Sequence, residues 1–200
     1  METRGPWRVK TTRIAYDNPW MRVLDHDVIR PDGKPGRYGV MSPANYAIIV
    51  LPVHADGTIT MVGQHRFATD RYEWELPEGG GAKTDAPLDS AKRELREETG
   101  LTAANWQETF RADLSNSITD ETGFGFIAWN LEQGEAEPDG TEIIETRRLA
   151  FTEAVDQAAA GVFRDMPTVA MLMLTHYMAV SGRLDADLAH TLLGRGRTTG

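Results

Sequence analysis

Three glutamates within five positions are the residues of this sequence best suited to chemistry. Glu94, Glu97 and Glu98 stand in the segment RELREETGL, residues 93–101. A helix turns by about 100° per residue, so the three carboxylates would share one narrow face. Their mutual repulsion disfavours a helix, and a divalent cation would remove it. Because Mg²⁺ prefers carboxylate oxygens together with substrate phosphates, the cluster predicts a Mg²⁺ site that Mn²⁺ could also occupy.

The residues around the three acids predict a helix that presents them. Leu88, Ala91 and Leu95 would form a buried stripe beside the acidic face. Pro87 suits a helix start, and Gly100 suits the position just after a helix end. A solvated acidic face is the usual explanation of a short glutamate cluster, but these flanking residues favour a metal-binding site.

Composition excludes several classes of protein. The chain has 200 residues, no cysteine and a formal net charge of −9. An acidic protein gains little from counterion release, so we expect no nucleic-acid partner. No apolar run approaches the roughly 18 residues of a membrane span, so no membrane partner is expected either. The N-terminus lacks the apolar region of a secretory signal, and with the absence of cysteine this predicts a cytoplasmic protein.

The first part of the chain predicts a small antiparallel β meander. Strands are expected over residues 9–16, 20–30 and 38–41, with turns at Asp17-Asn18-Pro19 and at residues 31–36. So small a meander buries little surface by itself. It must therefore pack on the main domain or on another subunit.

The remainder alternates strand and helix patterns. Strands are expected over residues 47–53, 58–66, 106–114, 123–131 and 142–149, and helices over residues 152–160, 165–180 and 185–193. Gly79, Gly80 and Gly81 indicate a tight loop before the acidic helix. These elements predict an α/β fold, a mixed sheet with helices packed against it. A stripe in the long helix is expected to face the core: Met166, Val169, Ala170, Met173, Leu174 and Tyr177.

The segment 79–101 resembles the Nudix box: glycine, five residues, an acid, seven residues, then R-E-apolar-x-E-E-x-G-apolar. The matching positions here are Gly79, Asp85, Arg93, Glu94, Leu95, Glu97, Glu98, Gly100 and Leu101. The match covers 23 of the 200 residues and is specific. One position departs from it, because Asp85 stands where the family has glutamate.

The resemblance implies an α/β/α sandwich around the mixed sheet. An N-terminal meander is typical of the branch that hydrolyses ADP-ribose and nucleoside-diphosphate sugars, whose members dimerise through it, often with exchanged strands. We therefore expect a meander over residues 1–43 that serves dimerisation, a Nudix domain over 44–194 and a flexible tail over 195–200. The protein is expected to be a homodimer.

The resemblance also implies the roles of the acids. Glu94 and Glu98 would bind the metal most directly, Glu97 would share or bridge, and Glu97 and Glu98 are taken as catalytic. The backbone carbonyl of Glu78 would be a further metal ligand. Arg93 is expected to hold Glu94 or Asp85 in orientation, and Asp85 to cap the helix.

The general base is predicted on a loop after the box, as in relatives that hydrolyse ADP-ribose. Glu142 is the favoured residue. The alternatives are Glu145, Glu137, Asp139, Asp120 and Glu121.

Three residues are predicted to bind substrate. Trp20 follows an Asn-Pro turn and would stack on the nucleobase, although packing within the meander is an equal alternative. Arg66 ends a Gln-x-Arg segment and would contact the diphosphate. Glu75 precedes Leu76-Pro77 and would face the base or ribose.

The resemblance implies a Mg²⁺-dependent pyrophosphatase whose partner is a small nucleoside diphosphate derivative. ADP-ribose is the first candidate, giving AMP and ribose 5-phosphate, and GDP-mannose, an ADP-sugar or a UDP-sugar come next. A hydrolase of nucleoside triphosphates or dinucleoside polyphosphates is the second interpretation. A non-catalytic sensor of nucleotide sugars is the third.

Overall fold

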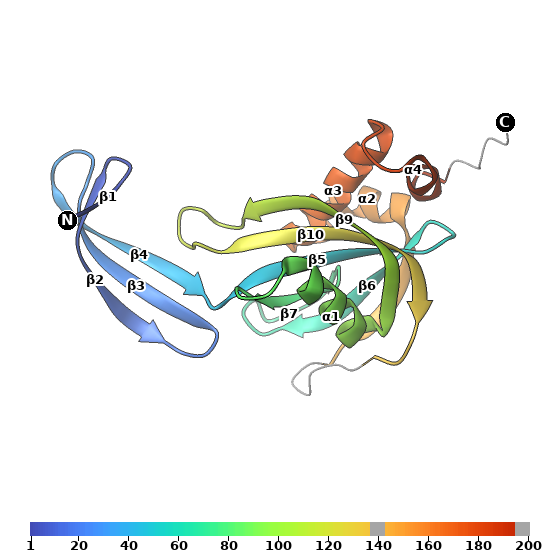
Figure 1. The fold of residues 1–200 in the computed structure, drawn as a ribbon, viewed down its shortest axis with the longest axis horizontal. Coiled ribbons are helices and arrows are strands. Elements are labelled where there is room, and N and C mark those ends of the chain that lie inside the picture. The colour runs from blue at the N-terminus through green and yellow to red at the C-terminus, as the bar shows by residue number, and fades with distance from the viewer. Residues whose placement is uncertain (137–142, 195–200) are drawn as a thin grey trace.

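The computed structural model describes residues 1–136 and 143–194. A four-stranded antiparallel sheet, here called the arm, precedes a larger α/β body (Figure 1). The arm strands are β1 (Glu2–Arg4), β2 (Trp7–Asp17), β3 (Met21–Ile29) and β4 (Pro35–Pro43), paired in that order. The predicted meander is therefore confirmed and gains β1. Three residues are too few to show a strand pattern in sequence, so β1 was not predicted.

The body is built on a mixed seven-stranded sheet. Its strands are β5 (Asn45–Val53), β6 (Thr58–Arg66), β7 (Arg71–Glu75), β8 (Glu78–Ala82), β9 (Leu101–Asp113), β10 (Thr122–Gln133) and β11 (Glu145–Ala150). The order is β11-β6-β5-β10-β9, with β7 paired to β6 and β8 paired to β5. β10 runs parallel to β5, and the other pairs are antiparallel. The predicted mixed sheet is confirmed.

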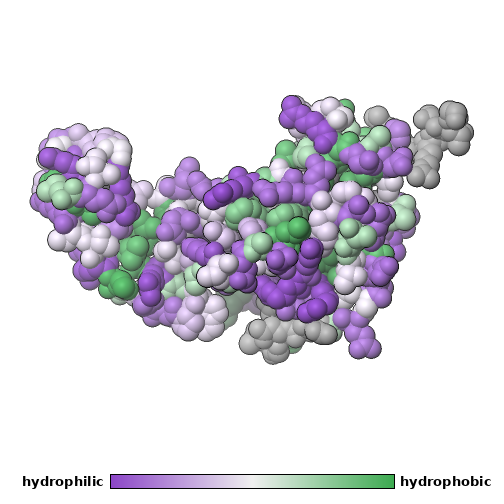
Figure 2. All heavy atoms as spheres, in the orientation of Figure 1, coloured by the Kyte–Doolittle hydropathy of each residue, from purple (hydrophilic) through white to green (hydrophobic). Residues whose placement is uncertain are grey.

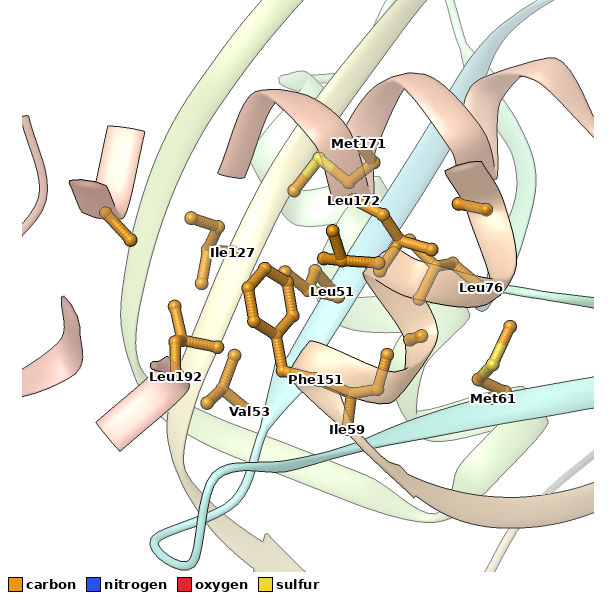
Figure 3. Packing of buried hydrophobic residues seen from close by; sticks show 14 of the residues in the cluster. Leu51, Val53, Ile59, Met61, Leu76, Ile127, Phe151, Met171, Leu172 and Leu192 are labelled. Carbon is orange, nitrogen blue, oxygen red and sulfur yellow. The ribbon is translucent and has the colours of Figure 1, made fainter. Parts of the chain in front are cut away.

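Helices cover both faces of this sheet. They are α1 (Pro87–Thr99), α2 (Phe151–Ala159), α3 (Met166–Val180) and α4 (Ala186–Leu192). Side chains alternate along β5, so Ile48 packs in the cluster with α1 while Ile49 and Leu51 pack in the cluster with α2, α3 and α4. Figure 3 shows Phe151 of α2 beside Leu51 in the larger cluster. This two-sided burial forms the predicted α/β/α sandwich.

The glycine segment is a strand and not the predicted loop. Gly79 and Gly80 pair with Ile48 and Ala47 of β5 within β8. A Cβ at Gly80 would lie 2.6 Å from the Asn45 side chain, so the strand accepts glycine because a neighbour crowds its backbone. In sequence a glycine run signals a loop, which explains the wrong prediction.

The predicted core face of α3 is also largely wrong, although Val169 of the predicted stripe is partly buried against the core. Met166, Met173 and Tyr177 are 68%, 41% and 51% exposed, whereas Met171 and Leu172 are fully buried. The helix is apolar on most sides, so hydrophobic periodicity could not select the face. Contacts with the sheet select it instead.

The arm meets the body through backbone and polar contacts. The amide of Met41 donates to the carbonyl of Ile118 at 2.9 Å, and the Tyr38 hydroxyl donates to the carbonyl of Ser117 at 2.7 Å. The Ser42 hydroxyl donates to the carboxylate of Asp120 at 2.8 Å. These contacts hold the arm against the connection between β9 and β10. Among the described helices, none has the length and apolar character needed to cross a membrane.

The orientation of α3 can be tested by two neighbouring substitutions. Leu172→Ala should lower the free energy of unfolding by about 2–5 kcal/mol, because it leaves a cavity in the core. Met173→Ala, on the exposed side, should change it by less than about 1 kcal/mol. Urea denaturation followed by circular dichroism measures both. Equal losses would contradict this orientation of the helix.

Candidate active site

Helix α1 places its acids against β8. Pro87 opens the helix, and Gly100 ends it in the left-handed region, with φ of 71° and its amide donating to the carbonyl of Arg96. Ala91 and Leu95 of α1 are fully buried in the smaller core cluster, as the sequence predicted. The side of α1 that carries the acids is thereby turned toward the sheet.

Two of the box acids reach the backbone at the start of β8. A Cβ at Gly79 would come closer than 3.0 Å to the carboxylate of Glu94, a separation that real Cβ atoms essentially never show. The Oε2 of Glu98 accepts the amide hydrogen of Glu78 at 3.1 Å. Glu94 and Glu98 are 8% and 5% exposed. The structure thus brings both carboxylates to the backbone of Glu78 and Gly79, although the sequence places them 15 or more residues away.

Arg93 holds this arrangement together. Its guanidinium donates to the Oε2 of Glu97 at 2.8 Å and to the carbonyl of Gly80 at 2.7 Å, and it lies 2.7 Å from the Oε1 of Glu94. Burial opposes the charged guanidinium, yet the carboxylates of Glu94 and Glu97 outweigh it and raise the pKa of Arg93. The predicted orienting role toward Glu94 is confirmed.

Asp85 does not cap the helix. The N-cap is Ala86, which makes no side-chain capping bond. The carboxylate of Asp85 is exposed and accepts a hydrogen bond from the Thr84 hydroxyl at 3.0 Å. The prediction is therefore wrong, because Pro87 begins the helix one position further along than an Asp85 cap would require.

Arg66 and Glu75, both predicted from sequence, lie together beside Glu78. The guanidinium of Arg66 contacts the Oε1 of Glu75 and the Oε1 of Glu78, each at 2.6 Å, and its Nε donates to the Oε2 of Glu75 at 3.1 Å. The Gln64 side chain donates to the Oε1 of Glu75 at 3.0 Å. One arginine is therefore shared by two carboxylates on either side of Leu76-Pro77.

Asp165 completes this acidic group, and sequence reasoning missed it. Its carboxylate oxygen lies with those of Glu75 and Glu78 in a set whose members are all within 4.8 Å of one another. It is also the N-cap of α3, where it accepts the amide hydrogen of Thr168 at 2.7 Å. The sequence carries a signal for this cap, an aspartate just ahead of Pro167, but none for its position beside β8.

The acidic group carries more negative charge than its arginine balances. Burial, followed by the charges of Asp165 and Glu75, raises the pKa of Glu78 well above its ordinary value. Burial also raises the pKa of Glu75, against the effect of Arg66. A carboxylate with a raised pKa resists ionisation unless positive charge is supplied. This chemistry, together with the carboxylates at Gly79, suits a divalent cation.

Trp20 belongs to the arm and, within the described part of the chain, makes no hydrogen bond to the acids of this cluster. It stands in the turn between β2 and β3, where its carbonyl accepts the amide hydrogen of Ala44 at 2.7 Å. The residue is 73% exposed, so the alternative that it packs within the meander is wrong. Its contact with a nucleobase stays a prediction.

The structure describes only some of the candidate general bases. Glu142, the favoured residue, lies outside the described residues, as do Glu137 and Asp139. Glu145 begins β11 and accepts a hydrogen bond from the Tyr72 hydroxyl, which contributes after burial to the raised pKa of Tyr72. Asp120 belongs to the contact between arm and body.

Comparisons with known proteins agree with this geometry. Residues 43–170 match the NUDIX domain, which is more than half of the chain. The chain belongs to the Nudix family. Residues 7–41, which form most of the arm, match the nucleoside diphosphate sugar hydrolase N-terminal domain. The Nudix box, residues 79–101, therefore lies within the matched NUDIX domain.

The chain is similar to proteins named as pyrophosphatases. It is 32% identical to an ADP-ribose pyrophosphatase of Bacillus subtilis, covering 67% of this chain and 75% of that protein. It is 30% identical to a GDP-mannose pyrophosphatase of Yersinia enterocolitica, covering 72% and 78%. A crystal structure of an ADP compounds hydrolase shares the fold, with a TM-score of 0.79, 18% identity and coverage of 92% and 100%.

Nudix hydrolases generally use a divalent metal, and the residues of this site suit one. Glu94 and Glu98 offer carboxylates beside the backbone of Glu78 and Gly79. Arg93 contacts the carboxylates of both Glu94 and Glu97. Hard oxygen donors are the ligands that such a cation takes.

The close approach at Gly79 gives a direct test of this site. Gly79→Ala should displace the Glu94 carboxylate and weaken Mn²⁺ binding by roughly 10–100-fold, the usual effect of disturbing a ligand's support. Electron paramagnetic resonance of Mn²⁺ measures the affinity. Gly39→Ala is the matched control, because a Cβ at this strand glycine meets nothing within 4 Å. Unchanged affinity in Gly79→Ala would contradict the site.

Proposed function

We propose that this Nudix hydrolase cleaves the pyrophosphate bond of a nucleoside diphosphate linked to a sugar, with Mg²⁺ as its metal. ADP-ribose is the first candidate substrate, giving AMP and ribose 5-phosphate, and GDP-mannose is the second. The observation that carries the proposal is the placement of Glu94 and Glu98 at the backbone of Glu78 and Gly79. The substrate class is supported by the arm's match to the sugar hydrolase N-terminal domain and by the named relatives.

Each residue of the site has a role in this proposal. The carboxylates of Glu94 and Glu98, the carbonyl of Glu78 and the shared Glu97 would hold the metal. Bound Mg²⁺ supplies charge neutralisation to the diphosphate and lowers the pKa of the attacking water. Glu97 and Glu98 count as catalytic because they would stand at the reacting groups. Arg93 orients the carboxylates of Glu94 and Glu97 through its contacts with them.

Arg66 would contact the diphosphate of the substrate. Its described contacts use Nε and one terminal nitrogen, and a guanidinium has five N–H donors. The second terminal nitrogen is therefore suited to a phosphate oxygen. Glu75, which Arg66 and Gln64 orient, would face the base or ribose, and Trp20 would stack on the base.

The proton of the attacking water would pass to Glu142. The choice of Glu142 as the general base is supported by the resemblance to ADP-ribose hydrolases, in which the base stands on a loop after the box. Asp120 is the weaker alternative, because its carboxylate accepts a hydrogen bond from Ser42 of the arm. Glu145 is weaker for a similar reason, since it accepts a hydrogen bond from Tyr72.

A panel of ADP-ribose, GDP-mannose, ADP-glucose and UDP-glucose with Mg²⁺ tests the function. The parent protein should hydrolyse at least one of them, with release of a nucleoside monophosphate detected by chromatography. Glu94→Gln and Glu98→Gln should each lower kcat/KM by about 10²-fold or more, because they remove charge that the metal requires. Glu142→Gln should lower kcat by about 10²-fold, the usual contribution of a general base.

Glu108→Gln, an exposed acid on β9, is the matched control and should keep parent activity. Full activity in both box variants would overturn the metal assignment. A kcat within about threefold of the parent would remove Glu142 as the base. Turnover of nucleoside triphosphates alone would favour a triphosphate hydrolase, and no turnover of any diphosphate would favour a sensor.

We also propose that the protein is a homodimer joined through the arm. One face of the arm carries apolar residues, among them Val9 and Val28, around a hollow of about 170 Å³. Ile14 on β2 is 53% exposed. Figure 2 shows hydrophobic atoms on the arm and where it approaches the body. The same face of a second copy of the chain would cover these apolar residues.

A cytoplasmic location stays a prediction from the cysteine-free sequence.

Light scattering coupled to gel filtration tests the dimer. The parent should have twice the chain mass of 22.2 kDa. Ile14→Asp should shift it toward the monomer, because a charge on a buried interface face is costly. Arg8→Asp, on the same exposed strand β2, is the control. A monomeric parent at micromolar concentration would overturn the proposal.

A further inference from the structure

The segment Leu76-Pro77-Glu78 is held from three sides by three different elements. The amide of Leu76 donates to the Thr168 hydroxyl of α3 at 2.9 Å. The carbonyl of Pro77 accepts from the amide of Val50 in β5 at 2.9 Å. The amide of Glu78 donates to the carboxylate of Glu98 in α1 at 3.1 Å. Each residue of the segment therefore has one backbone group tied to a separate part of the body.

The contact with α3 comes from a buried side chain at the capped start of the helix. Thr168 is fully buried, and it stands in the first turn of α3. Its amide donates to the carboxylate of the N-cap Asp165 at 2.7 Å, and Pro167 restricts the backbone before it. Because the cap and the proline set the start of the helix, the hydroxyl is set in turn at the amide of Leu76.

The burial of Leu76 makes the hydrogen bond from its amide to Thr168 important for the position of the backbone. Leu76 is fully buried in the core cluster beneath α3, so its amide has no access to water. A buried N–H without an acceptor is strongly unfavourable. Loss of the Thr168 hydroxyl would therefore favour a shift of the Leu76 backbone, and Glu78 is only two residues away.

We propose that Thr168 is a positioning residue for the metal site, because it fixes the backbone that leads to the carbonyl of Glu78. The amide of Glu78 contacts Glu98, and the next residue, Gly79, lies against Glu94. The inference rests on the proposed function for the role of that carbonyl as a ligand. Thr168 itself touches neither substrate nor metal. It acts through Leu76, from a helix 92 residues further along the chain.

The chain offers a matched control on the same helix. Thr175 lies seven residues after Thr168, is equally buried, and its hydroxyl has no hydrogen-bond partner among the described residues. Thr168→Val and Thr175→Val thus remove the same atom from two buried positions of α3. Only the first of them removes a hydrogen bond to the metal-site segment. Thr168→Ser restores the hydroxyl.

The experiment measures two properties that do not require turnover. Mn²⁺ affinity is obtained by electron paramagnetic resonance without substrate, and exchange of the Leu76 amide is followed by nuclear magnetic resonance in metal-free buffer. Thr168→Val should weaken Mn²⁺ binding by roughly 10–100-fold and accelerate exchange of the Leu76 amide by at least about tenfold. Thr175→Val and Thr168→Ser should stay within about threefold of the parent in both.

Thr168→Val with parent Mn²⁺ affinity would overturn the proposal. Equal losses in Thr168→Val and Thr175→Val would also overturn it, because they would show only a structural effect on α3. If Thr168→Val does not fold, comparison of Thr168→Ala with Thr168→Ser decides in the same way. A parent protein that binds Mn²⁺ but hydrolyses no diphosphate sugar would refute the proposed function and leave this inference standing.

Discussion

The contact between the Glu94 carboxylate and the bare backbone of Gly79 is the constraint on which the site depends. A side chain of any size at that position would push the acid away. Glycine therefore lets a helix and a strand approach until carboxylates and peptide groups share one place. The pairing of β8 with β5, the burial of Ala91 and Leu95, and the contacts of Arg93 all serve to keep that approach.

The same closeness concentrates negative charge. Glu75 and Glu78 share the guanidinium of Arg66, and Asp165 lies beside these two acids. Burial raises the pKa of Glu78 and of Glu75. Buried carboxylates short of positive charge are unfavourable for folding. A chain that retains them must gain elsewhere, and binding of a cation with a phosphorylated substrate is the gain that this geometry offers.

Much of the fold and part of the site could be predicted from the sequence. Strand β6 was predicted over its observed residues, and the helix of the acids ends at Gly100 as expected. The buried stripe of α1 follows from periodicity, because only one side of that helix is apolar. Periodicity failed for α3, whose Met173 is exposed, because nearly every side of it is apolar. Strand β8 was predicted as a loop because a run of glycines in a sequence indicates a flexible backbone. The sequence does not show that the carboxylate of Glu94 approaches position 79 so closely that glycine is required there.

The sequence by itself determined the spacing of Glu94, Glu97 and Glu98, and hence the family and the general chemistry. Helical periodicity is local, so it survives without knowledge of the rest of the chain. Only the tertiary structure decided that Asp165 lies beside Glu78 and that Thr168 holds Leu76. Those pairs are separated by more than 80 residues. Their contact depends on how the helices pack on the sheet, and no local pattern records that packing.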